Sequence, residues 1–112
     1  MDISVIICTY NRAESLPKTF QTLAAMDVPP GLSWELIVVN NNSSDSTEAV
    51  VAGFQAKAQF PVKYLFQGRQ GKSHALNAGI QAAEGEFVAF TDDDCIVHKH
   101  WLKSLKRSLE AS

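Results

Sequence analysis

The sequence lacks the features of a membrane-spanning, secreted or disulfide-rich protein. No apolar run approaches the roughly 20 residues that a membrane-spanning helix needs. The first residues, MDISVIIC, carry an acidic side chain where a signal peptide carries basic ones. Only two cysteines are present, Cys8 and Cys95, and neither has metal-site spacing. Reduced thiols and a cytoplasmic location are therefore expected.

Positive charge and known phosphate-binding glycine motifs are also scarce. The ten Lys and Arg residues are scattered and balanced by twelve Asp and Glu, for a formal net charge of -2, which excludes a general nucleic-acid surface. A Walker A motif would need a glycine where the chain has Phe66, and GxGxxG is absent. P-loop and GxGxxG dinucleotide-binding proteins are thus excluded, and no membrane segment is expected.

Strand and helix patterns alternate along the 112 residues. Apolar, largely β-branched runs predict buried strands at 3–9, 34–39, 62–66 and 87–90, the first of them central. One helix is predicted to begin at about residue 13, with Asn11 as its cap. A second is predicted to follow a cap at Ser44 or Asp45 and to end at residue 54. Two more are predicted from Ser73 to about 83 and from about 99 to 109. This order predicts one α/β domain over residues 1–112: a three-layer αβα, doubly wound, mainly parallel sheet.

Polar residues follow each predicted strand. They are Thr9, Tyr10 and Asn11 after the first, residues 40–45 after the second, residues 67–72 after the third and Asp92, Asp93 and Asp94 after the fourth. Ligands of doubly wound sheets bind outside the carboxyl ends of the strands. The sequence therefore predicts that these four loops form one binding site.

The three consecutive aspartates predict a metal site. Carboxylates this close together repel one another, and a cation would compensate for the hydration they lose. Alternate residues of an extended segment point to one side, so Asp92 and Asp94 can face one ion while Asp93 turns away. Hard oxygen ligands suit Mg²⁺ or Mn²⁺. A solvated acidic turn is the alternative.

The segment Gly68 to Ser73 predicts a weaker phosphate site. Gly71 and the start of the following helix offer backbone N–H groups, and Arg69 and Lys72 offer positive charge, to a diphosphate. The alternative is an ordinary turn with two solvated cations.

Taken together, these residues resemble a known family. The succession ISVIICTYNR, ELIVVNNNSSDST, GKSHALNAGIQAAEGEFVAFTDDDC and HKHWL is similar to the N-terminal, nucleotide-sugar-binding half of family 2 glycosyltransferases of the GT-A fold. The resemblance covers residues 3–105. It implies metal-dependent transfer of a sugar from a nucleotide-diphosphate sugar to an unknown acceptor, with a UDP-sugar as the favoured donor. It also implies a single displacement that inverts the anomeric carbon of the sugar. Asp92 and Asp94 match the Asp-x-Asp motif, which holds Mn²⁺ or Mg²⁺.

The resemblance also implies roles for individual residues. Contacts to the base and ribose fall on Thr9, Tyr10, Asn11 and Asn40. Asp92 and Asp93 also contact the donor, with Asp93 near the ribose. The diphosphate is bordered by Gly71, Lys72 and Asn77. Many relatives have an acid where this chain has Asn40. An Asn can accept a base N–H through its carbonyl or rotate to donate instead. The identity of the donor base is correspondingly open.

The resemblance implies a truncated chain. The acceptor-binding half, with the carboxylate that acts as general base, has no counterpart after Ser112, so we expect donor and metal binding alone. Residues beyond this chain could associate a longer parent with a membrane. An exposed sheet edge is predicted, through which a homodimer could form.

Two other functions share parts of this pattern. A nucleotidyltransferase would want a glycine-rich loop directly after the first strand, and TYNRAES has no glycine. A non-catalytic nucleotide- or metal-binding α/β module stays open as the alternative.

Overall fold

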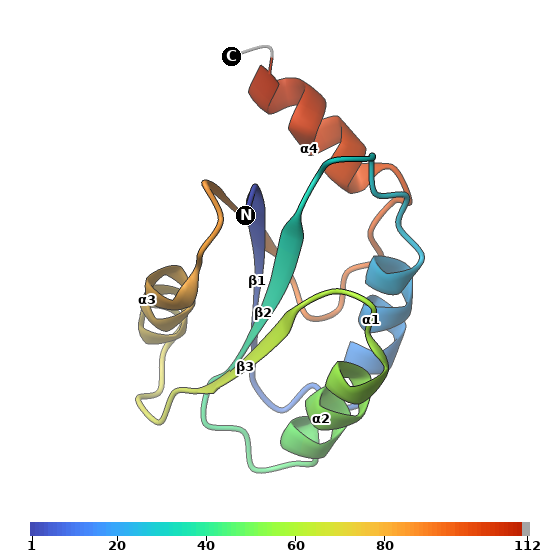
Figure 1. Cartoon of the computed structure of the whole chain (residues 1–112). Helices are drawn as coiled ribbons and strands as arrows, with labels where there is room; N and C mark the ends of the chain where they lie inside the picture. Colours follow the sequence, from blue (N-terminus) through green and yellow to red (C-terminus); the bar gives the residue numbers. More distant parts are fainter. Residues whose placement is uncertain (111–112) are drawn as a thin grey trace.

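The structure, a computed structural model, describes residues 1–110 and the side chains as far as residue 108. Strands and helices alternate along the chain, as the ribbon in Figure 1 shows. Their order is β1 (Ile3–Thr9), α1 (Leu16–Ala24), β2 (Trp34–Asn40), α2 (Thr47–Lys57), β3 (Val62–Phe66), α3 (Lys72–Ala82), β4 (Phe87–Thr91) and α4 (Trp101–Glu110).

The four strands form one parallel sheet in the order β3-β2-β1-β4. β1 lies between β2 and β4, with Ile3 opposite both Trp34 and Phe87. The predicted central position of the first strand is therefore confirmed. Because β2 and β4 flank β1, the chain order reverses at β1, and this is the place where sheets of this class bind ligands.

Helices cover both faces of the sheet. α3 lies on one face, and α1, α2 and the start of α4 lie on the other (Figure 1). β1 supplies Ile3, Val5 and Ile7 to the larger core on the α1 and α2 side, and Ile6 to the smaller core under α3. The three-layer prediction is confirmed.

α3 approaches the sheet closely because its contact face carries small residues. Ala75 is fully buried, and a Cβ on Gly79 would lie 2.8 Å from Ile6 Cγ2 and 3.3 Å from Val39 Cγ2. No larger side chain fits at residue 79 without moving the helix outward. This fit fixes the height of α3 above the carboxyl ends of β1 and β2.

An ion pair between a buried carboxylate and a half-buried lysine lies at the opposite end of the sheet. Glu35 is fully buried, and its carboxylate accepts the Ser4 hydroxyl at 2.6 Å and the Glu84 N–H at 2.8 Å. Lys63 Nζ lies 2.9 Å from the other oxygen and donates to Ala82 O at 2.9 Å. Burial raises the pKa of Glu35, but the hydrogen bonds from Ser4, Glu84 and Lys63 outweigh it, so the pKa is lowered overall.

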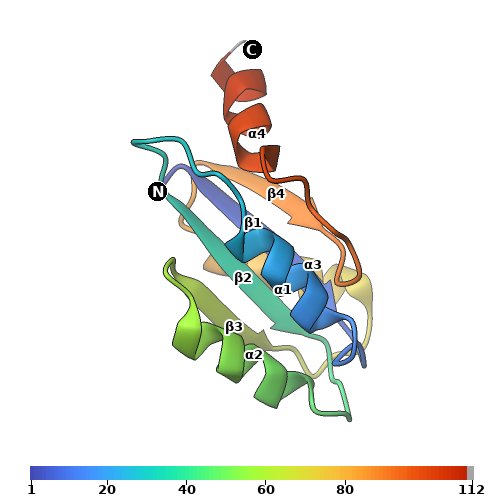
Figure 2. The ribbon, with the colours of Figure 1, turned by 90° about the vertical axis from the view of Figure 1, so that its right-hand side faces the viewer.

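β4 is more exposed than its apolar sequence predicts. Phe87, Val88 and Phe90 are 43%, 37% and 51% exposed. The reason is position: within residues 1–110 no strand pairs with the outer edge of β4, and α3 packs mainly on β1 and β2 (Figure 2). The prediction that this strand is buried is wrong, whereas the predicted exposed edge is confirmed.

The helix starts differ by one to three residues from the prediction. α1 begins at Leu16 because Asn11 adopts a positive φ of 51° and turns its side chain to Ser44 instead of capping a helix. α3 follows Gly71, so Ser73 lies inside the helix and is not its cap. α4 begins at Trp101. Within residues 1–110, no helix combines the length and the apolar character that crossing a bilayer requires.

Candidate functional site

A cavity of about 430 Å³ opens at the carboxyl ends of β1 and β4, beside the first turn of α3. All four predicted loops contribute to it. Its lining comprises Ile6, Cys8, Thr9, Tyr10, Arg12, Asn41, Gln70, Gly71, Lys72, Ala75, Leu76, Phe90, Thr91, Asp92 and Asp93. The structure thus brings together the loops that the sequence predicted to converge.

The end of β1 contributes a buried threonine to the lining of this cavity. Thr9 is only 2% exposed, and its Oγ1 has no hydrogen-bond partner among the described residues. Tyr10 and Arg12 also line the cavity and are exposed. Buried hydroxyls are nearly always paired, so this unpartnered oxygen is an unusual feature of the residues around the cavity.

Asn11 and Asn40 lie at this edge but outside the cavity lining. Asn11 donates its N–H to Ser43 Oγ at 2.9 Å and accepts the Ser44 N–H at 2.8 Å, which joins the first two loops. Asn40 is 3% exposed; it donates to Tyr64 Oη at 3.0 Å and accepts the Ser43 N–H at 3.0 Å. Both side chains organise the loops that surround the cavity.

Asn41 was not singled out from the sequence, yet it lines the cavity and is 5% exposed. Its side chain bonds to three backbone groups of the β3–α3 loop, at Gln67, Arg69 and Gly71. The run of three asparagines at 40–42 was a visible signal. Sequence alone, however, could not distinguish the inward-facing member from its neighbours.

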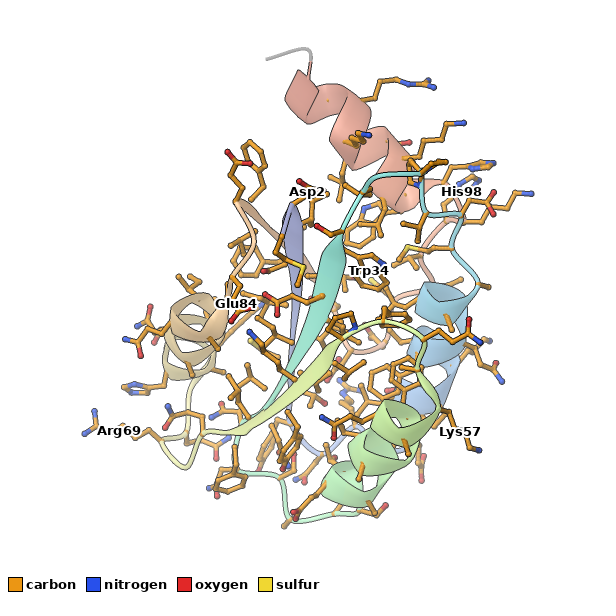
Figure 3. The ribbon with its side chains drawn as sticks, viewed as in Figure 1. Asp2, Trp34, Lys57, Arg69, Glu84 and His98 are labelled. Carbon is orange, nitrogen blue, oxygen red and sulfur yellow. The ribbon has the colours of Figure 1, made fainter. Side chains whose placement is uncertain are left out.

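The start of α3 supplies the cationic side of the cavity. Lys72 lines it, and Gly71 directly before the helix has a φ of 131°, which favours glycine. Arg69 extends outward from the loop (Figure 3) and does not line the cavity. Asn77 lies further along α3, is exposed, and also stays outside the lining.

The aspartate triplet forms a turn rather than continuing β4. The strand ends at Thr91, and the Cys95 N–H reaches Asp92 O at 3.4 Å. The Asp93 carbonyl oxygen accepts the hydroxyls of Thr19 at 3.1 Å and Ser15 at 3.4 Å, which fastens the turn to α1. The predicted extended alternation is wrong, because the turn itself sets the directions of these side chains.

The turn nevertheless brings Asp92 and Asp94 together. One ligand atom from each, with the Cys95 thiol, lies within 4.8 Å of the others. Asp92 and Asp93 line the cavity, and Asp94 does not. Two adjacent carboxylates that can converge on one point are a donor set that fits Mg²⁺ or Mn²⁺.

Charges of both signs line the cavity. Burial raises the pKa of the Cys8 thiol; the positive charge of Lys72 opposes this rise and the negative charge of Asp93 adds to it. Cys8, Lys72 and Asp93 all line the cavity. A ligand in the cavity would therefore meet both a cation and carboxylates.

The parallel sheet and the cavity at the reversal of strand order define a ligand-binding α/β domain of the GT-A type. The family model described as "Glycosyl transferase family 2" matches residues 4–112. The chain belongs to this family.

Named relatives agree with this assignment. The chain is 35% identical over 105 residues to the succinoglycan biosynthesis protein ExoM of Rhizobium meliloti, covering 94% of this chain and 34% of ExoM. It superposes on residues 1–349 of S. aureus TarS with a TM-score of 0.84 and 32% identity, over 99% of this chain and 33% of that one. The chain spans about a third of the length of these relatives.

A third relative was solved with ligands. The mannosyltransferase PcManGT from Pyrobaculum calidifontis, in complex with GDP-Man and Mn²⁺, superposes with a TM-score of 0.82 and 29% identity, over 89% of this chain and 30% of that one. TarS 1–349 was also solved in complex with UDP-GlcNAc.

Proposed function

We propose that this chain binds the nucleotide-diphosphate-sugar donor of a metal-dependent, inverting glycosyltransferase. The observation that carries the proposal is the cavity itself, which is lined by Thr9, by Lys72 at the start of α3, and by Asp92 and Asp93 of the turn that also contains Asp94. Hydroxyl, cation and carboxylates at one sheet edge suit a ligand with a polar base, phosphates and a bound metal. Relatives solved with UDP-GlcNAc or GDP-Man support this ligand class.

Each end of the donor has suitable partners. We assign the base and ribose to the loop of Thr9, Tyr10 and Asn11, with Asn40 behind it and Asp93 towards the ribose. Lys72 lines the cavity at the N-terminus of an 11-residue helix, where backbone N–H groups favour anions. We assign the diphosphate to this end, next to Gly71 and with Asn77 further along the helix. A UDP-sugar is the favoured donor.

Asp92 and Asp94 are the proposed metal ligands, for Mn²⁺ or Mg²⁺. When bound, such a cation neutralises the negative charge of a departing nucleoside diphosphate. The chain's own contribution is to hold the donor with its anomeric carbon open to an acceptor. A single in-line displacement there would invert that carbon, and no general base is assigned among these residues.

Binding of UDP or GDP, each with and without Mn²⁺, tests the proposal by calorimetry. We expect metal-dependent binding that is lost in Asp94→Asn, which removes the carboxylate charge at nearly constant size. Glu48→Gln is the matched control, because Glu48 is exposed at the start of α2, away from the cavity. Binding of Mn²⁺ that is indifferent to nucleotide would instead support a metal-binding module without transferase function.

Two wider parts of the proposal concern the whole protein. A cytoplasmic location is supported by the free thiols of Cys8 and Cys95. Homodimerisation through the β4 edge is supported by its exposed Phe87 and Val88, since exposed sheet edges pair readily. Sedimentation of the chain over a range of concentrations would test the dimer, and a monomer at all concentrations would contradict it.

A further inference from the structure

Asn41 connects the first and third loops of the site. Its backbone N–H donates to Thr9 O at 2.8 Å, at the end of β1. Its side-chain Nδ2 donates to Gln67 O at 3.2 Å and to Arg69 O at 2.7 Å, while its Oδ1 accepts the Gly71 N–H at 3.0 Å. With only 5% of the residue exposed, Asn41 is held by four hydrogen bonds to backbone groups that are distant in the sequence.

These bonds determine which backbone groups a ligand can meet. The Gly71 N–H is already paired with Asn41, and the Gly71 carbonyl accepts the Ala75 N–H at 3.3 Å, which closes the first turn of α3. The next three N–H groups, of residues 72–74, are the ones that a helix start leaves without intrahelical partners. The bond from Asn41 therefore orients the Gly71 peptide and with it the free N–H groups at the helix start.

An amide is suited to this place. The three side-chain contacts need two N–H donors and one acceptor on the same planar group. An Asp at this position could accept from Gly71 but would set its carboxylate against the carbonyl oxygens of Gln67 and Arg69. An Ala would leave all three backbone groups without their present partner.

The neighbouring Asn42 has a different setting. It is exposed, has a φ of 62°, and donates from Nδ2 to Gln70 Oε1 at 3.3 Å. It does not line the cavity. Asn42→Asp therefore adds the same negative charge to the same loop as Asn41→Asp does. It leaves the contacts of Asn41 in place.

We propose that Asn41 is the positioning residue for the diphosphate: it holds the loop before α3 so that the N–H groups of residues 72–74, with Lys72, face the phosphates. This inference rests on the proposed function. Asn41 itself does not touch the phosphates. Its loss should therefore weaken binding of the diphosphate and leave binding of the nucleoside nearly unchanged.

The test compares UDP with uridine, each measured with Mn²⁺ by calorimetry or by displacement of a fluorescent nucleotide. In Asn41→Ala and Asn41→Asp, the affinity for UDP should fall by about tenfold or more, the size expected for losing one hydrogen bond to a charged group. The affinity for uridine should change by less than about twofold, within the effect of a weak contact. Asn42→Asp should keep the UDP-to-uridine affinity ratio of the original chain.

The outcomes separate this inference from the proposed function. If the original chain binds neither UDP nor GDP, the proposed function fails, and the role of Asn41 fails with it. If the original chain binds UDP and the two Asn41 variants bind it equally well, or lose UDP and uridine in the same proportion, only the positioning role is overturned. A collapse of the UDP-to-uridine ratio in both Asn41 variants supports it.

Amide exchange in the unmutated chain covers the case in which the Asn41 variants do not fold. By NMR, the Gly71 amide should be protected before UDP is added and should stay protected afterwards. The amide resonances of residues 72–74 should shift on adding UDP. Faster exchange of the Gly71 amide hydrogen after UDP is added, with no shift of the amide resonances of residues 72–74, would overturn the inference.

Discussion

The close packing of α3 on the sheet predicts opposite effects for two glycine-to-alanine changes. Gly53 lies in α2, and a methyl group added there would have no neighbouring atom within 4 Å, so Gly53→Ala gains only helix propensity. That gain is about 0.5–1 kcal/mol. Gly79→Ala gains the same propensity, but its methyl would lie 2.8 Å and 3.2 Å from two carbons of Ile6 and 3.3 Å from Val39 Cγ2.

These distances set the magnitude of the difference. Carbon atoms in favourable contact are about 3.5–4.0 Å apart, so the new methyl overlaps its neighbours. Ile6 is 1% exposed on the central strand β1, which leaves it little room to move. Overpacking of this kind costs about 1–3 kcal/mol. Gly79→Ala should therefore be less stable than Gly53→Ala by about 1–3 kcal/mol, because the propensity gain is common to both.

Urea unfolding followed by circular dichroism measures this difference. The two variants should have equal slopes with urea and different midpoints, as expected when stability alone changes. Equal stabilisation by both substitutions would refute the reasoning, since α3 would then have room above Ile6. A reduced slope in Gly79→Ala would instead indicate a loosened native state.

Three further predictions concern single contacts within the fold. Gly85→Ala should destabilise the chain more than Gly79→Ala, because its Cβ would lie 2.5 Å from the backbone N of Ser4; a midpoint equal to that of the unmutated chain would contradict this. The pKa of Glu35 is lowered in the folded chain, so its carboxylate stabilises the fold at pH values above the ordinary carboxyl pKa. This stability is lost as the pH falls through the lowered pKa. Glu35→Gln should therefore flatten the acid side of a curve of unfolding free energy against pH. Thr19→Val, which removes the hydroxyl bond to Asp93 O, should cost about 1 kcal/mol in urea unfolding and weaken Mn²⁺ binding, whereas unchanged Mn²⁺ affinity would show that α1 does not hold the turn.

Elements whose residues are apolar on both faces could be predicted from the sequence. β1 occupies residues 3–9 as expected, and β2 extends one residue beyond its predicted end. In these strands the local pattern and the tertiary position agree, because a central parallel strand is covered on both faces. β4 has a similar pattern but lies at the sheet edge, and its exposure depends on strand order, which hydrophobicity does not encode.

The site was predictable at the level of loops and less so at the level of side chains. The sheet topology brings all four loops to one cavity, so knowing where strands end was sufficient. The directions of Asn40 and Asn41 depend on partners more than 20 residues away, such as Tyr64 and the Gly71 amide. Likewise, the pairing of Asp92 with Asp94 was expected, but it arises from a turn that local alternation does not describe.

The place of β4 in the sheet has a consequence for synthesis of the chain on the ribosome. Of the four described strands, β4 is made last, yet it pairs with β1, so Ile3 can pair with Phe87 only after Phe87 has left the ribosome. Pairing of β1, β2 and β3 can proceed earlier, leaving one side of β1 open in the nascent chain. Asp92 and Asp93 therefore reach the cavity after Thr9 and Lys72, and the lining of the cavity is complete only when β4 has paired with β1.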